Sequence, residues 1–291
     1  MERVMVRNGI IILALVSIIS TSVWADSGSE MSLNEIAAPV THPTSFEDPR
    51  PYTEIRPIYI YHKIDENFVT GGGAANVYAL QLRYAVNDRL AIIATKDGYV
   101  DLNTESVLDD EEGFADISAG FKYAFYRDDA ARKIITAGLR FEIPTGDKEV
   151  FQGQGDGTFN PFLSAAIGMG TVNFMLGTGF RLAVDDEDSS FYDLDLHLDT
   201  KVGWLHPLVE LNVYHVIDGG SRLGIPDEGE DFFNFGASGA SGKTLVAAAV
   251  GFRADLSDTI SMGAAYQLPV SSGNGSDILD YRVTTDLIFR F

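Results

Sequence analysis

Along most of this chain, apolar and polar residues alternate one by one. The last stretch shows the pattern most clearly, with apolar positions at Tyr281, Val283, Thr285, Leu287, Phe289 and Phe291. The positions between them are Arg282, Thr284, Asp286, Ile288 and Arg290. Because successive side chains of a strand point to opposite faces, this stretch predicts a strand with one apolar and one charged face.

The same alternation predicts about twelve strands over residues 53–291. They span 54–64, 76–86, 89–100, 114–126, 132–143, 158–169, 172–184, 190–204, 208–217, 242–255, 259–270 and 281–291. Their connections alternate in length, with tight turns at 87–88, 170–171, 205–207 and 257–258 and longer ones at 101–113, 144–157 and 218–239. Bacterial outer-membrane barrels have an even number of strands, short periplasmic turns and longer outer loops. The pattern therefore places both termini on the periplasmic side.

The polar faces decide between a membrane barrel and a water-soluble barrel or sandwich, which remains the alternative. They mix single charges of both signs with small residues, among them Gly120, Gly138, Gly177, Gly179, Gly251 and Gly263. Such residues suit a crowded, hydrated lumen, whereas the apolar faces suit lipid. We therefore predict an all-β fold, a closed antiparallel transmembrane β-barrel with up-and-down topology.

The first 25 residues are predicted to be a signal peptide. Arg3 and Arg7 precede a short apolar run at 9–20, and Val23-Trp24-Ala25 offers a cleavage site. The run is too short for a transmembrane helix. Residues 26–52 are polar, contain four prolines and show no period. We interpret them as an irregular periplasmic arm, preferably a mobile tail and alternatively a small plug in the lumen.

Composition narrows the possible chemistry. The chain has 291 residues, a formal net charge of −21 and no cysteine. The charge argues against nucleic-acid binding, and the lack of cysteine excludes disulfides and thiolate metal sites. We expect no cofactor and no metal.

The mature chain resembles a group of uncharacterised porin-like outer-membrane β-barrels of a transporter family, near the MetA-type barrels linked to phenol-degradation operons. The segments that carry the resemblance are 53–57, 113–117, 121–123, 143–146, 207–212 and 281–291. A last strand ending on an aromatic residue, here Phe291, is also similar to the signal that the barrel-assembly machinery reads. The resemblance implies a barrel in the bacterial outer membrane, in contact with outer-membrane lipid and that machinery, and a passage for small-molecule solutes. It implies no catalytic residues.

Charged residues on the predicted inward face are the candidates for a constriction of the lumen. They are Arg181, Asp193, Asp195, His197, Asp199, Lys201, Glu210, Arg253 and Arg282. Cross-strand neighbours lie about 5 Å apart, so these residues can form a ladder of ion pairs. The ladder either selects solutes by charge or only fills a narrow barrel, and we favour the second interpretation.

Other motifs carry weaker signals. Acidic runs at 109–112, 185–188 and 227–231 are expected to be solvated loops, with divalent-cation binding as the alternative. The glycine-rich 153–157 is not followed by a helix, so a phosphate site is not expected. His197 beside Ser164 or Ser118 is the only catalytic arrangement considered, that of a barrel hydrolase.

The function predicted from the sequence is passive passage of small hydrophilic or amphipathic solutes across the outer membrane. The alternatives are a structural barrel that does not conduct and, less favoured, a hydrolase.

Overall fold

The computed structural model describes residues 32–271 and 277–291. The expected signal peptide, residues 1–25, and residues 26–31 of the arm lie outside this range. The described residues form one antiparallel sheet that closes on itself, because β1 pairs with both β14 and β2. The strands are β1 (Glu54–Ile64), β2 (Gly73–Ala85), β3 (Leu90–Lys96), β4 (Tyr99–Thr104), β5 (Glu111–Phe114), β6 (Ile117–Asp128), β7 (Lys133–Ile143), β8 (Thr158–Met169), β9 (Val172–Ala183), β10 (Ser190–Thr200), β11 (Leu205–Asp218), β12 (Thr244–Asp255), β13 (Ile260–Pro269) and β14 (Tyr281–Arg290).

Two of the barrel's strands are interrupted, so fourteen segments make twelve barrel strands. β3 and β4 pair with successive parts of β2, while β6 and β5 pair with β3 and β4. At the first interruption Asp97 accepts a hydrogen bond from the Leu80 amide at 2.9 Å, in place of a ladder bond. Gly98 has φ +144°, and a Cβ there would lie 2.4 Å from the Tyr78 carbonyl oxygen. The predicted twelve-strand, up-and-down, closed barrel is confirmed.

The faces of the strands are oriented as the alternation predicts. Phe121 is 51% exposed on the outer wall, whereas its neighbour Lys122 is fully buried inside. On β14, Arg282, Thr284, Asp286 and Ile288 are buried and the residues between them are not. A soluble barrel would show the opposite arrangement, so the described barrel is apolar outside and charged inside.

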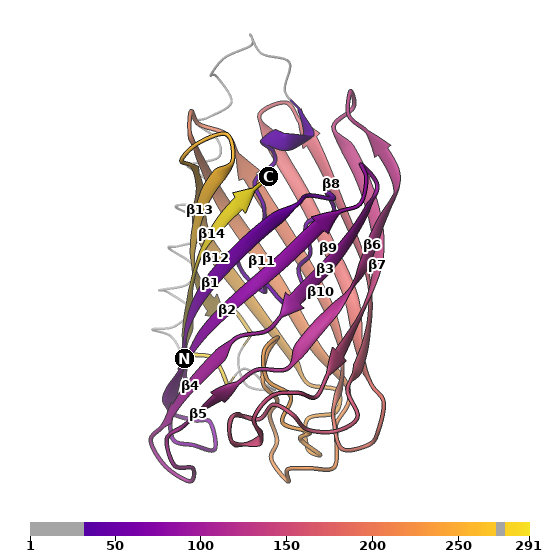
Figure 1. Cartoon of the computed structure of the whole chain (residues 1–291). Coiled ribbons are helices and arrows are strands. Elements are labelled where there is room, and N and C mark those ends of the chain that lie inside the picture. Colours follow the sequence, from indigo (N-terminus) through magenta and orange to yellow (C-terminus); the bar gives the residue numbers. More distant parts are fainter. Residues whose placement is uncertain (1–31, 272–276) are drawn as a thin grey trace.

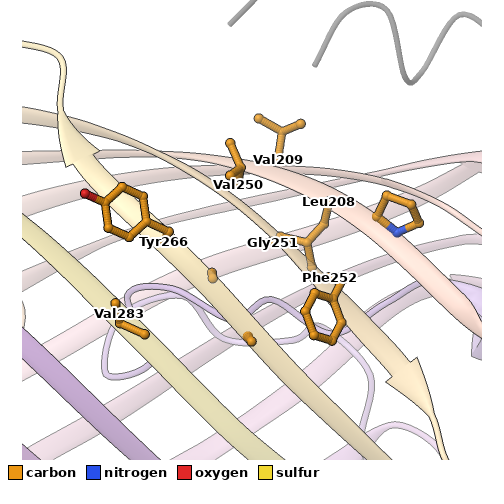
Figure 2. A pocket seen from close by; sticks show the side chains of 10 residues that line it. Leu208, Val209, Val250, Gly251, Phe252, Tyr266 and Val283 are labelled. Carbon is orange, nitrogen blue, oxygen red and sulfur yellow. The ribbon is translucent and has the colours of Figure 1, made fainter. Parts of the chain in front are cut away.

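The outer wall has a broad apolar concavity, about 460 Å³ in volume, across β11 to β14. Figure 2 shows Val209, Val250, Phe252 and Tyr266 around it. Ala264, whose side chain is small, also lies among the lining residues. Most of its lining residues face outward, but Leu208 and Ala265 also belong to the buried cluster that includes Val40 of the arm.

The connections gather at the two ends as expected, but two of their predicted bounds are wrong. The predicted turn 205–207 belongs to β11, and the tight turn is at 201–204. β4 and β5 take up most of the predicted loop 101–113, because pairing with β2 and with each other extends both strands, and leave a loop at 105–110. Tight turns join β2 to β3, β6 to β7, β8 to β9, β10 to β11 and β12 to β13. The longer loops lie together at the other end, the lower end in Figure 1. The two described helices, Leu33–Glu35 and Lys148–Val150, are single 3₁₀ turns, and neither could cross a membrane.

Gly120 of β6 offers a test of the tight inter-strand contact. A Cβ at Gly120 would lie 2.0 Å from the carbonyl oxygen of Leu139 on β7. Gly120→Ala should therefore lower the free energy of unfolding by about 1–3 kcal/mol. The measurement is a urea titration in detergent micelles, read by the faster electrophoretic migration of the folded barrel.

Gly224→Ala is the matched control, because a Cβ at Gly224 meets nothing within 4 Å. Equal stability of the two variants would show that β6 and β7 can separate to accept the methyl group.

Candidate functional site

The lumen is occupied by the N-terminal arm. Residues 32–52 lie among inward-facing side chains of the barrel, and most of them are buried, including Val40, His42 and Phe46. The preferred interpretation of this segment as a mobile tail is wrong for residues 32–52, and the plug alternative describes them. The physical reason is that the arm's backbone finds hydrogen-bond partners on the wall that a composition argument does not count.

The arm enters and leaves the barrel at the tight-turn end. Arg50 closes it by donating hydrogen bonds to the carbonyl oxygens of Leu33 and Ile36, at 2.8 and 2.7 Å. The same guanidinium binds the Asp48 carboxylate through two nitrogens, at 2.8 and 2.5 Å. The arm is therefore a closed loop with fixed ends, and the residues between Ala37 and Phe46 reach furthest along the lumen.

Carboxylates of β10 and β11 bind the arm's backbone. Glu210 accepts hydrogen bonds from the amides of Val40 and Thr41, at 2.9 and 2.7 Å, and one from the Thr41 hydroxyl. Asp199 accepts from the Ala37 amide at 3.1 Å. His197 lies between these carboxylates, with its ring nitrogens 2.7 Å from Glu210 and 3.1 Å from Asp199. An ionised carboxylate only accepts hydrogen bonds. The backbone amides of an irregular chain have no partners within a helix or strand, so they can donate to it.

Guanidiniums of the wall bind the arm's carbonyl groups in the same way. Arg253 donates to the Ala38 carbonyl oxygen at 2.9 Å, and Arg140 donates to that of Thr44 at 2.5 Å. Arg253 also forms an ion pair with Asp286 at 2.8 Å. Backbone groups buried without partners are costly, and the wall supplies these partners.

Glu47 makes the most buried ion pairs of the arm. Its carboxylate lies 2.7 Å from both Arg83 of β2 and Lys122 of β6, and all three side chains are almost fully buried. Burial opposes ionisation of Glu47, but these two cations outweigh it and hold its pKa below the ordinary value. Glu47 is therefore a charged anchor between the arm and two strands.

An apolar cluster fills the space beside these polar contacts. Phe46 packs with Leu33, Ile36 and the inward-facing Met175 of β9. A Cβ at Gly177 would lie 2.7 Å from the Phe46 ring. The small inward residue at 177 thus makes room for an arm side chain.

A second segment, the loop between β11 and β12, enters the lumen from the opposite end. Its Asp231 is fully buried and forms an ion pair with Arg282 of β14 at 2.7 Å, and Glu230 pairs with the same guanidinium. Arg181 of β9 donates to the carbonyl oxygens of Glu230 and Asp231. Interpreting the acidic run 227–231 as a solvated loop is therefore wrong, because inward-facing arginines bind it.

Glu228 fixes the conformation of this loop. Its carboxylate accepts hydrogen bonds from the amides of Gly229, Phe235 and Ala237 and from the Ser189 hydroxyl. These four donors surround one buried side chain. The loop is thus folded around its own acidic residue rather than repelled by it.

The arm and the loop meet inside the barrel. The Thr44 hydroxyl donates to the Asp231 carbonyl oxygen at 3.1 Å, and His42 lies 2.7 Å from Asp195 of β10. Burial opposes protonation of His42, but Asp195 and Asp231 outweigh it and raise its pKa to about 10. The charged imidazole therefore links the arm, the wall and the loop by electrostatic attraction.

The structure brings most of the predicted constriction residues to the lumen but not into one ladder. Asp195, Asp199, Glu210 and Arg253 bind the arm, while Arg181 and Arg282 bind the loop. Only a long contact of 3.9 Å joins Arg181 to Asp193, whose carboxylate also accepts a hydrogen bond from Ser45 of the arm. Lys201 lies near the tight-turn end and pairs with Glu35 at 3.4 Å.

The catalytic arrangement considered from the sequence is not formed. His197 is bound by two carboxylates, and the hydroxyls of Ser118 and Ser164 have no hydrogen-bond partner within the described residues. Over 32–271 and 277–291, no group of three or more His, Asp or Glu side chains could hold a metal ion.

Sequence reasoning missed the functional residues outside the strands, chiefly His42, Glu47, Glu228 and Asp231. One signal was present. The arm and the β11–β12 loop carry acidic residues that complement the arginines predicted on the inward faces.

Comparison with solved structures supports the observed fold. No family model and no curated protein matches this chain. Among solved structures, the barrel is similar to an outer membrane channel from Pseudomonas putida F1, with a TM-score of 0.61 and 16% identity over 88% of this chain and 100% of that chain. It is also similar to the NanC porin, with a TM-score of 0.51 and 11% identity over 82% and 99%. The chain thus has the fold of a porin-like outer-membrane β-barrel.

Glu47→Ala tests the anchor of the arm. The substitution leaves Arg83 and Lys122 buried without this partner, which typically costs about 3–5 kcal/mol. We expect the arm to leave the lumen, and chymotrypsin to cleave at Phe46, detected by mass spectrometry of the detergent-solubilised barrel.

Glu105→Ala is the control, because Glu105 forms a surface ion pair with Lys63 at 3.6 Å and is largely exposed. Removing such a pair costs at most about 1 kcal/mol. Resistance of both variants to cleavage at Phe46 would mean that the arm stays in place without Glu47.

His42 gives a prediction about pH. Its pKa is raised from 6.5 to about 10 in the folded state, so its stabilising charge is fully present below pH 6.5 and is lost as the pH rises through about 10. The difference in unfolding free energy between the unchanged protein and His42→Asn should shrink over this interval. Asn is chosen because His42 has φ +56°, which Asn tolerates.

Urea titrations of both proteins from pH 6 to pH 10.5 measure this difference. A difference that stays constant with pH would contradict a charged His42.

Proposed function

We propose that this protein is an outer-membrane channel for small hydrophilic or amphipathic solutes, held closed by the arm and the β11–β12 loop. The observation that carries the proposal is that two segments outside the barrel wall occupy the lumen. The side chains that bind them have charges of both signs. If both segments moved aside, they would leave a polar passage through the barrel.

The nature of the contacts supports a movable closure. The arm is bound mainly by hydrogen bonds and ion pairs to side chains, which water can replace when the lumen hydrates. The structural neighbours, an outer membrane channel and a porin, support the same function for this fold. We also propose that the protein lies in the bacterial outer membrane, as these neighbours do. Its apolar outer wall would contact lipid there. We propose that this protein is not an enzyme.

A structural barrel that does not conduct is the second candidate, because the inward-facing side chains are buried in the described state. Conductance in planar lipid bilayers separates the two. The protein with residues 26–52 deleted should give longer-lived and larger current steps than the protein with the arm, because the deletion removes one of the two segments that occupy the lumen.

Glu228→Ala is the second variant in this assay, since it releases the loop without removing a wall residue. It should also raise the conductance. A folded barrel that combines the arm deletion with Glu228→Ala and still carries no current would favour the structural role, because neither segment would then close the lumen.

A further inference from the structure

An apolar pocket lies among the loops at the end opposite to the tight turns. Its volume is about 150 Å³, and its inner wall includes Ile64 at the end of β1, Leu102 of β4 and Phe151 after the second 3₁₀ turn. The β11–β12 loop contributes Leu223, Ile225 and Phe235. Four separate loops and strand ends therefore build one concave site that none of the candidate lumen residues lines.

The lining favours an apolar occupant. Its two polar side chains are already satisfied, since Thr70 donates to the Gly72 carbonyl oxygen and Thr104 to that of Leu108, each at 2.8 Å. A water molecule needs two to four polar partners to occupy a cavity stably. A cavity of about 150 Å³ lined by Leu, Ile and Phe side chains can stay dry and bind benzene.

Aromatic rings define the shape of the pocket. Phe235 lies between Phe68 and Phe151, with ring centroids 6.0 and 4.9 Å away. Aromatic rings attract one another in tilted and edge-to-face arrangements at such distances. A single additional ring is the ligand that such an arrangement accommodates best.

The rim of the pocket is open to solvent. Val69, Val107 and Leu108 are 45%, 76% and 40% exposed. Exposed apolar side chains that adjoin a cavity are typical of a binding site. A ligand can therefore reach the pocket from the loop end of the barrel.

The inner wall connects the pocket to the closure of the lumen. Ile64, Leu102, Phe151 and Phe235 also line a second cavity of about 20 Å³. Its other lining includes His62 and Glu230, and Glu230 is the loop residue that pairs with Arg282. The Phe151 and Phe235 rings thus stand between the outer pocket and the ion pair that holds the loop.

We propose that this pocket is a binding site for the apolar part, about the size of a single benzene ring, of one small amphipathic molecule. It serves as the outer site from which a solute passes Phe151 and Phe235 toward the lumen. The binding site stands by itself, whereas its role in passage rests on the proposed channel function.

Fluorobenzene tests the binding site. Fluorine NMR of the full chain in detergent micelles separates saturable binding to the protein from partition into micelles, which rises linearly and is measured with empty micelles. Ile225→Trp fills the pocket and should abolish saturable binding. Leu223→Asn places an unpaired amide against the ligand and should weaken binding by at least about tenfold, the equivalent of 1.4 kcal/mol.

Leu256→Trp is the matched control, because Leu256 is an exposed apolar residue at the tight-turn end. It should bind fluorobenzene as the unchanged protein does. Partition without saturation in the unchanged protein would overturn the proposal, as would saturable binding that persists in both folded pocket variants.

Bilayer currents keep the two proposals apart. If the channel function fails, no variant conducts, although saturable binding remains. If the binding site fails, saturable binding is absent while the arm-deleted protein still carries current.

Discussion

The structure depends on satisfying the backbone groups of an irregular segment inside a barrel. Residues 32–52 form only one short 3₁₀ turn, so most of their amides and carbonyls need partners from elsewhere. Inward-facing carboxylates accept hydrogen bonds from the amides, and guanidiniums donate to the carbonyl groups. The charged side chains inside the barrel therefore supply the hydrogen-bond partners that an arm without regular structure lacks.

Buried ion pairs such as these add little net stability compared with well-packed apolar side chains. Taking two charges out of water costs about as much as their attraction returns, whereas removing one partner is strongly destabilising. Glu47, held between Arg83 and Lys122, therefore fixes the position of the arm. Asp231 does the same for the β11–β12 loop through Arg282. Each segment thus has its own anchor on the wall, and the hydrogen bond from Thr44 to Asp231 joins the two segments.

The two ends of the lumen differ in polarity. The arm presents polar backbone and charged side chains from the tight-turn end, and the loops at the opposite end present an aromatic, apolar pocket. His62 and Glu230 lie near the boundary between the two environments. A solute that crosses this barrel would move from an apolar site into a polar passage, which suits amphipathic molecules.

Strand positions could be predicted from the sequence because alternation is a local property. The orientation of Phe121 against Lys122, or of Leu287 against Asp286, follows from neighbouring residues alone. The interruption at 97–98 could not be predicted in this way, because Asp97 completes a ladder with Leu80 of another strand. For the candidate site, Asp195, Glu210 and Arg282 could be assigned to the lumen, but their partners could not.

The sequence by itself determined the barrel, its strand number and which face is apolar, since each follows from a period of two along the chain. Only the tertiary structure decided what fills the lumen. The contacts of His42 with Asp195 and of Asp231 with Arg282 join residues far apart in the chain. No local pattern encodes them, because they exist only after the sheet has closed around both segments.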